Sequence, residues 1–188
     1  MKTKLFTTLF FVAALFCIGC SDNENLQDQL PPITQTGANT FGCVINGEVL
    51  IPKDGIGVPL LRGLEVGIEP NNNFYISSTN LMDTNGLYIY IYINNLTSSG
   101  IYNIELSEGL SINHFTPNYP HVFCSGNNNS QRSVYHSNTN SGTITITRFD
   151  PTNHIVSGTF ELTAFNKNNP NETIEITEGR FDVNWVTL

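Results

Sequence analysis

Apolar residues recur at every second position through most of this chain, and this alternation limits what it can fold into. GTITITRF (142–149) alternates isoleucine with threonine, and GTFELTAF (158–165) alternates Phe160, Leu162 and Ala164 with polar residues. A period of two is typical of a strand with one buried and one solvated face, whereas an amphipathic helix repeats every 3.6 residues. The pattern therefore predicts an all-β fold that needs no helix.

Turn residues separate the predicted strands, of which we expect about nine or ten. Asn46-Gly47 stands between two apolar runs and predicts a tight hairpin, because both central residues of such a turn need positive φ. One solvated face on most strands favours an antiparallel two-sheet β-sandwich, with a β-barrel as the alternative. Residues 107–130 are expected to form a long irregular loop. Further strands are expected at 64–68, 74–78, 86–93, 101–106, 131–136 and 173–186.

The N-terminus has the order of a secretory signal. Lys2 and Lys4 precede an apolar run that reaches Ile18 and is followed by Gly19. The run is shorter than the roughly 20 apolar residues of a transmembrane helix. We therefore expect residues 1–19 to be a signal peptide that is removed.

The end of this run, Cys17-Ile18-Gly19-Cys20, resembles a bacterial lipobox. The resemblance implies that Cys20 is the first mature residue and carries lipid, which would attach the protein to a membrane. Cys17 stands where lipoboxes usually have leucine, so use of Cys17, or no lipidation, is the alternative. A CxxC redox motif is not expected, because no βαβ pattern surrounds the pair.

The segment 20–38 is polar and contains proline, so it is predicted to be a flexible tether in front of a single β-domain, residues 39–188. Asp22 and Glu24 resemble the export signal that sends lipoproteins of Bacteroidetes-type bacteria to the outer face of the outer membrane. The resemblance implies an outer-membrane lipoprotein displayed on the surface; an ordinary solvated tether is the alternative.

The charge balance is acidic, with 8 basic and 16 acidic residues and a formal charge of −8. Removal of Lys2 and Lys4 with the signal peptide leaves six basic residues and a charge of −10. A negative surface cannot release counterions from a phosphate backbone, and anionic lipid headgroups repel it. We therefore expect no nucleic-acid partner, and membrane attachment only through the lipid on Cys20.

Two stretches, LPPITQTGANTFGCVINGEVLIP (30–52) and VSGTFELTAFNKNNPNETIEITEGRFDV (156–183), resemble a family of Bacteroidetes-type lipoproteins of unknown function. They cover the start and the end of the mature domain. The resemblance implies a secreted β-domain on a lipid tether, and it transfers no catalytic residue, because the family has none assigned.

No catalytic constellation is found in the sequence. The four histidines have neither HxH nor HExxH spacing, and no G-x-S-x-G nucleophile elbow occurs. His114 and His121 flank an aromatic stretch, but no third metal ligand is near them in the sequence. We assign no catalytic residue, metal ligand or cofactor.

The stretch GLYIYIYIN (86–94) is the candidate binding feature. Period two places the isoleucines on one face, which should be core, and Tyr88, Tyr90 and Tyr92 on the other. The tyrosine row either forms an exposed aromatic platform of the kind on which sugars stack, or lies under a covering loop or sheet edge. A strand buried on both faces would give the same apolar run, and this favours the covered interpretation.

Two thiols remain once Cys17 is removed and Cys20 is lipidated. Cys43 lies in the first strand of the predicted hairpin and Cys124 in the predicted long loop. Export to a disulfide-permissive compartment favours a bridge between them. The alternative is that Cys43 is a small buried hydrophobe and Cys124 a loop thiol.

These observations predict a non-enzymatic envelope or cell-surface lipoprotein, a binding or structural accessory with a glycan or protein ligand. The alternative is a small secreted hydrolase or inhibitor whose site is assembled from distant loops. A pocket that gathers two carboxylates, or His114 with His121 and an acid, would favour the hydrolase, and a flat tyrosine face would favour the binding protein.

Overall fold

The computed structural model of this chain describes residues 26–83, 86–109, 119–128 and 131–188. The described residues form eleven strands and two short 3₁₀ turns, η1 (Leu26–Gln29) and η2 (Pro70–Asn72), and they contain no α-helix. The predicted all-β class is therefore confirmed. The strands are β1 (Thr40–Ile45), β2 (Glu48–Leu50), β3 (Leu64–Glu69), β4 (Asn73–Thr79), β5 (Tyr88–Ile93), β6 (Gly100–Asn103), β7 (His121–Asn128), β8 (Gln131–His136), β9 (Gly142–Asp150), β10 (Ile155–Asn166) and β11 (Thr173–Asn184).

All eleven strands belong to one antiparallel sheet. Its main path is β2-β1-β11-β10-β8-β7-β5-β4-β3, while β9 pairs with β10 and β6 with β9. Strand β10 is the junction, because its first part pairs with β9 and its last residues, Phe165 and Asn166, pair with β8. The sheet therefore curls into a half-barrel, and the predicted sandwich of two separate sheets is not confirmed. Alternation could not decide this, because a curled sheet also buries one face of each strand.

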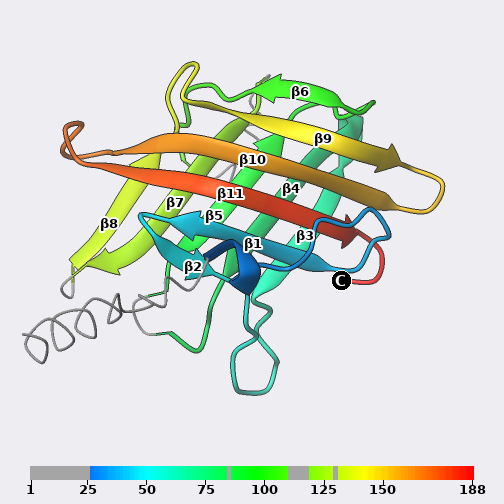
Figure 1. Ribbon diagram of the computed structural model, residues 1–188, viewed down its shortest axis with the longest axis horizontal. Helices are drawn as coiled ribbons and strands as arrows, with labels where there is room; N and C mark the ends of the chain where they lie inside the picture. The colour runs from blue at the N-terminus through cyan, green and yellow to red at the C-terminus, as the bar shows by residue number, and fades with distance from the viewer. Residues whose placement is uncertain (1–25, 84–85, 110–118, 129–130) are drawn as a thin grey trace, which may run out of the picture.

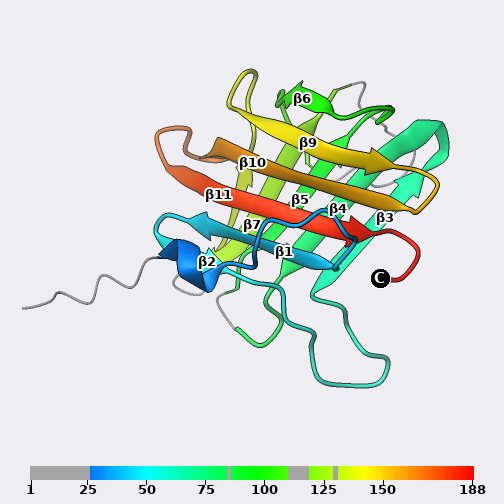
Figure 2. The same cartoon turned by 45° about the vertical axis from the view of Figure 1, so that its right-hand side comes forward.

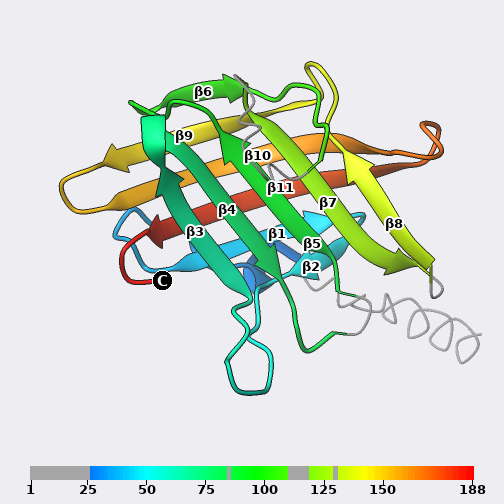
Figure 3. The same ribbon diagram turned by 180° about the vertical axis from the view of Figure 1, so that it is seen from behind.

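The two halves of the curled sheet lie face to face. In Figure 1, β1, β9, β10 and β11 run across the view, and β4, β5 and β7 lie behind them at an oblique angle. Figure 2 shows the same crossing after a 45° turn, and Figure 3 shows the second half from outside. Side chains that point inward from both halves form the core.

The isoleucines of β5 occupy this core, as predicted. Ile89, Ile91 and Ile93 have no exposed surface. Phe74 on β4 and Phe181 on β11 stack across the interior with ring centroids 6.1 Å apart. Contacts of this kind join the two halves, because each strand face buries its apolar side chains against the opposite half.

The hairpin predicted at Asn46-Gly47 is confirmed. Asn46 has φ 49° and Gly47 φ 84°, and Ile45 pairs with Glu48 on either side of them. The amide oxygen of Asn46 also accepts a hydrogen bond of 2.8 Å from the backbone of Glu175. The turn therefore closes the β1–β2 hairpin and fastens it to β11.

The prediction of one long irregular loop over residues 107–130 is wrong, because the segment contains β7. Strand β7 pairs with β5 and β8, and Val122 and Cys124 are buried in the core. The alternation in HVFCS is short and uses His, Cys and Ser, and flanking asparagines and prolines add turn character. Only pairing with β5 and β8 makes this stretch a strand.

Residues 30–38 lie against the domain, although the sequence assigns them to the flexible tether. Leu30 is buried, and the carboxylate of Asp182 on β11 binds the segment that follows it. The donors to this carboxylate are the Thr34 hydroxyl at 2.6 Å, the Thr36 and Gly37 amides at 2.8 Å, the Ala38 amide at 3.2 Å, the Thr36 hydroxyl at 3.3 Å and the Ser157 hydroxyl at 2.8 Å. Composition could not reveal this, because the receiving carboxylate is distant in the sequence.

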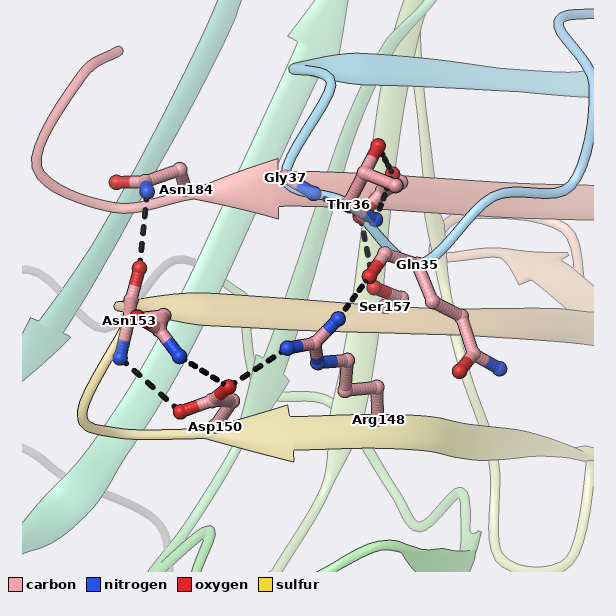
Figure 4. Close-up of polar contacts among 9 residues, drawn as sticks. Gln35, Thr36, Gly37, Arg148, Asp150, Asn153, Ser157 and Asn184 are labelled. Atoms are coloured by element: carbon pink, nitrogen blue, oxygen red, sulfur yellow. Dashed lines mark hydrogen bonds and ion pairs between the residues drawn. The ribbon is translucent and has the colours of Figure 1, made fainter.

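Asp182 stays charged although only 1 % of it is exposed. Burial raises its pKa, but the hydrogen bonds, led by that of Thr34, outweigh burial and hold the pKa at about 2. Figure 4 shows a second fastening beside it, in which Arg148 reaches Asp150 at 2.7 Å and the carbonyl of Gln35. The chain therefore enters the domain along a fixed path across β9, β10 and β11.

Candidate functional site

Strands β4, β5, β7 and β8 carry a set of aromatic rings on the outer face of their half of the sheet, the half seen from outside in Figure 3. Because the isoleucines of β5 point inward, its tyrosines point outward, and the register places Phe123 of β7 beside Tyr90 and His136 of β8 beside Phe123. We call this surface the aromatic face. It consists of Tyr75, Tyr88, Tyr90, Tyr92, His121, Phe123 and His136.

The rings of Tyr75 and Tyr90 are nearly parallel within the aromatic face. Their ring centroids are 6.2 Å apart and their planes differ by 19°. The Tyr75 ring lies over Gly67 of β3, where a Cβ atom would come within 2.6 Å of it. Glycine at this position therefore lets the ring lie across the neighbouring strand. Both rings are half-buried, so each keeps part of its surface open to solvent.

Acidic side chains lie at the edge of this pair. Glu65 and Glu69 on β3 are exposed. Burial is the largest cause of the raised pKa of Tyr75, and the negative charges of these two glutamates raise it further. Burial, and to a smaller extent Glu65, also raises the pKa of Tyr88. Parallel aromatic rings beside carboxylate acceptors suit a ligand that has an apolar face and hydroxyl groups at its rim.

The other end of the aromatic face is closed. Tyr92 and His121 have no exposed surface, and their ring centroids are 5.1 Å apart. Tyr119 contacts the imidazole of His121 at a centroid distance of 6.4 Å. Nδ1 of His136 donates a 2.7 Å hydrogen bond to the carbonyl of Ser107, which can only accept. The β6–β7 connection is therefore tied to this end.

His121 is a neutral imidazole at physiological pH. Burial lowers its pKa to about 4, although backbone groups of Tyr119 and Gly109 lie near enough to favour the charged ring in part. Within the described residues, the two ring nitrogens of His121 and the hydroxyl of Tyr92 complete no hydrogen bond. No carboxylate among the described residues is hydrogen-bonded to this histidine.

The predicted tyrosine row is thus divided. Tyr88 and Tyr90 are half-buried, whereas Tyr92 is completely buried beside His121. The sequence missed Tyr75 and Phe123, which belong to the same surface. The alternation in NFYIS and HVFCS was the available signal, but which strands lie beside β5 follows from the tertiary fold alone.

A hollow lies on the outer face of the other half of the sheet. It is a groove of about 270 Å³ over β9, β10 and β11, and its lining includes Glu161, Glu178 and Arg180. Arg180 is buried and its guanidinium lies 2.8 Å from the Glu178 carboxylate. A β-bulge opposite Phe160–Leu162 places Glu178 at φ 54°. Bulges of this kind re-aim side chains and occur beside active sites.

The groove lacks the environment of an acid–base pair. Hydrolases that use two carboxyl groups hold one of them neutral by burial while the other stays ionised. Both Glu161 and Glu178 are exposed here, and Glu178 is already paired with Arg180. The groove therefore offers polar contacts to a ligand more readily than it offers proton transfer.

The predicted Cys43–Cys124 disulfide is not present in the structure. Both residues are free and buried in the core, and Cys124 lies in β7, not in an irregular loop that needs a staple. Burial raises the pKa of Cys43 to about 12, and burial with the nearby Cys43 also raises the pKa of Cys124. Both thiols pack as small apolar side chains.

The remaining candidates are dispersed. His154 lies in the β9–β10 turn, His121 and His136 lie on the aromatic face, and His114 and Cys20 fall outside the described residues. Across the described ranges, no three His, Cys, Asp or Glu side chains are grouped so that they could hold a metal ion. Nor does any helix in those ranges have the length and apolar character to cross a membrane.

Comparison with known proteins adds no assignment to these surfaces. The chain matches no family model, no curated protein and no solved structure.

Proposed function

We propose that this chain is a non-enzymatic lipoprotein of the bacterial outer membrane, held at the cell surface by a lipid on Cys20, which binds a glycan or protein ligand through its aromatic face. We include in this proposal that the chain belongs to the Bacteroidetes-type lipoprotein family that it resembles in sequence. In this proposal the two facing halves of the sheet pack like the two layers of a β-sandwich, and the outer face of one half binds the ligand. The Tyr75–Tyr90 pair is the observation that supports the proposal most directly.

Two half-buried rings whose planes differ by only 19° offer parallel aromatic surface at the outer face of the sheet. Sugar rings have one apolar face and a rim of hydroxyls, so they can stack on the tyrosines while Glu65 and Glu69 accept hydrogen bonds at the edge. The formal charge of −10 after signal removal disfavours acidic polymers. Neutral glycans are therefore the ligand class that this surface suits best.

The test is Tyr90→Ala, measured by affinity electrophoresis in gels that contain soluble neutral polysaccharides. Loss of one stacking ring should weaken binding by roughly tenfold, since an aromatic contact contributes about 0.5–1.5 kcal/mol beyond its buried area. Tyr102→Ala is the matched control, because Tyr102 is a partly buried tyrosine on β6, away from the aromatic face. Its retardation should equal that of wild type.

Two results would contradict the proposal. Equal retardation of wild type and Tyr90→Ala by every polysaccharide that retards the wild type would mean that the aromatic face does not bind these polysaccharides. A loss of more than about 3 kcal/mol of unfolding free energy in Tyr90→Ala, which is the range of buried aromatic residues, would show that this ring is core.

The alternative function, a small secreted hydrolase or inhibitor, is favoured by one observation, the presence of Glu161 and Glu178 in the same groove. The backbone of Glu178 is in a conformation that non-glycine residues adopt at a cost, and such strain gathers at functional sites. Hydrolysis of nitrophenyl glycosides by wild type, lost in both Glu161→Gln and Glu178→Gln, would establish this alternative in place of the binding function.

A further inference from the structure

The connection between β2 and β3 exposes aliphatic side chains to an unusual degree. Ile56 is 86 % exposed, Val58 103 %, Leu60 52 % and Leu61 59 %. We call residues 55–61, with the sequence GIGVPLL, the apolar finger. Single exposed aliphatic residues are common on protein surfaces, but a contiguous group marks an interaction site.

The base of the finger is held in place by hydrogen bonds. The Gly55 amide donates to the Leu61 carbonyl at 3.0 Å, and the Gly63 amide donates to the Asp54 carboxylate at 2.8 Å. Lys53 forms an isolated bridge with Asn80, the residue that follows β4. The exposed tip is therefore presented by a closed loop fixed to the sheet.

The finger projects away from both halves of the sheet. In Figures 1, 2 and 3, which differ by turns about the vertical axis, it is the lowest part of the coloured chain. The β4–β5 connection descends at the same edge and adds Leu81 and Met82, which are 38 % and 55 % exposed. A group of six exposed apolar side chains thus shares one end of the molecule.

The distribution of charge around the tip matches a lipid interface. Residues 55–61 contain no charged side chain, whereas Lys53 and Arg62 stand at the base. Long basic side chains can place their apolar stems in the interface and their charges in the headgroup region. Arg62 lies 4.0 Å from Asp54, so the base is electrically mixed and is not repelled by a neutral bilayer surface.

The length of chain before the domain keeps the domain close to a membrane, an argument that depends on the proposed lipid at Cys20. Leu26 begins η1, the dark blue turn below β1 in Figure 1. The six residue steps from Cys20 to Leu26 can span at most about 20 Å. A tether of this length keeps the domain at the bilayer surface, where its local concentration favours even a shallow insertion.

We propose that the apolar finger inserts into the interfacial layer of the same bilayer that holds the lipid on Cys20. The domain then has two attachments, one covalent and one formed by Ile56, Val58 and Leu60. Two contacts restrict the tilt of the domain, so the aromatic face keeps a defined direction relative to the membrane.

The experiment uses the lipidated protein reconstituted in phosphatidylcholine vesicles. Val58→Cys is labelled with the polarity-sensitive dye NBD, and Asn169→Cys, an exposed residue in the β10–β11 turn, is the matched control. Cys43 and Cys124 are buried, so the dye should react with the introduced thiol and not with these two. We expect blue-shifted emission and quenching by lipid-borne spin labels for the dye at position 58 and neither for the dye at position 169.

A second variant keeps the test independent of the dye. Val58→Asp combined with Leu60→Asp changes only exposed side chains, so the thermal transition should stay unchanged while binding of unlipidated Cys20→Ser protein to the same vesicles falls by roughly tenfold or more. Fatty-acid labelling reports the lipid on Cys20 separately, so failure of the anchor and failure of the finger are distinguishable. Equal emission at positions 58 and 169 in lipidated protein would overturn the proposal. It would also be overturned if a protein partner in cells shielded the dye at position 58 while lipid-borne spin labels did not quench it.

Discussion

Replacement of Asp182 by asparagine tests whether one buried carboxylate fixes the entry of the chain into the domain. The carboxylate lies between β10 and the segment 34–38, and accepts bonds from Thr34, Thr36 and Gly37 at 2.6 to 2.8 Å. An asparagine would keep the volume of the side chain, but its amide group would present two donors to this ring of donors. We expect Asp182→Asn to loosen the segment and destabilise the domain.

The magnitude follows from the pKa and the hydrogen bonds. A fall of the pKa from 3.8 to about 2 corresponds to about 2 kcal/mol of stability contributed by the charged form at neutral pH. The hydrogen bonds of the surrounding donors are already contained in this value, because they are the cause of the lowered pKa. We therefore expect a loss of about 2–3 kcal/mol, which lowers the melting temperature of a domain of this size by roughly 5–10 °C.

The pH dependence gives a second, independent readout. Because the folded-state pKa is lower than the unfolded-state value, the contribution of the Asp182 charge is complete above the unfolded pKa and is lost as the pH falls through the folded pKa. Urea unfolding of wild type and Asp182→Asn should therefore differ most above pH 5. The difference should shrink by about 2 kcal/mol between pH 5 and pH 2.

Glu175→Gln is the control, since Glu175 is exposed on the same strand, and it should change the stability by less than about 0.5 kcal/mol at pH 7. The reasoning would be refuted if Asp182→Asn unfolded at the same urea concentration as wild type at pH 7. It would also be refuted if the difference between the two proteins were independent of pH.

Two further predictions concern the cysteines. Metabolic labelling with a fatty acid should mark the wild-type protein and not Cys20→Ala, and label that persists in the mutant would exclude Cys20 as the lipidated residue. Cys43 and Cys124 should resist iodoacetamide in the folded protein at pH 8 and react fully in urea, because burial raises the pKa of both thiols. A bridge between them would instead appear as an intact mass lower by two hydrogens than that of the reduced protein, with no reaction in urea.

The sequence by itself determined the features of this protein that depend on neighbouring residues. Alternation between the two faces of a strand is a local property, so the inward row of β5 and the outward position of Tyr88 and Tyr90 could be read directly. The Asn46-Gly47 turn is local in the same sense, because its two residues tolerate positive φ by themselves.

The tertiary structure decided which of these faces meet. Tyr75 reaches Tyr90 because β4 pairs with β5 and because Gly67 leaves room on β3, and Asp182 captures Thr36 from the far end of the chain. Strand β7 exists as a strand through its two neighbours. Register and pairing between distant segments are set by the summed packing of the core, which no local window of sequence contains.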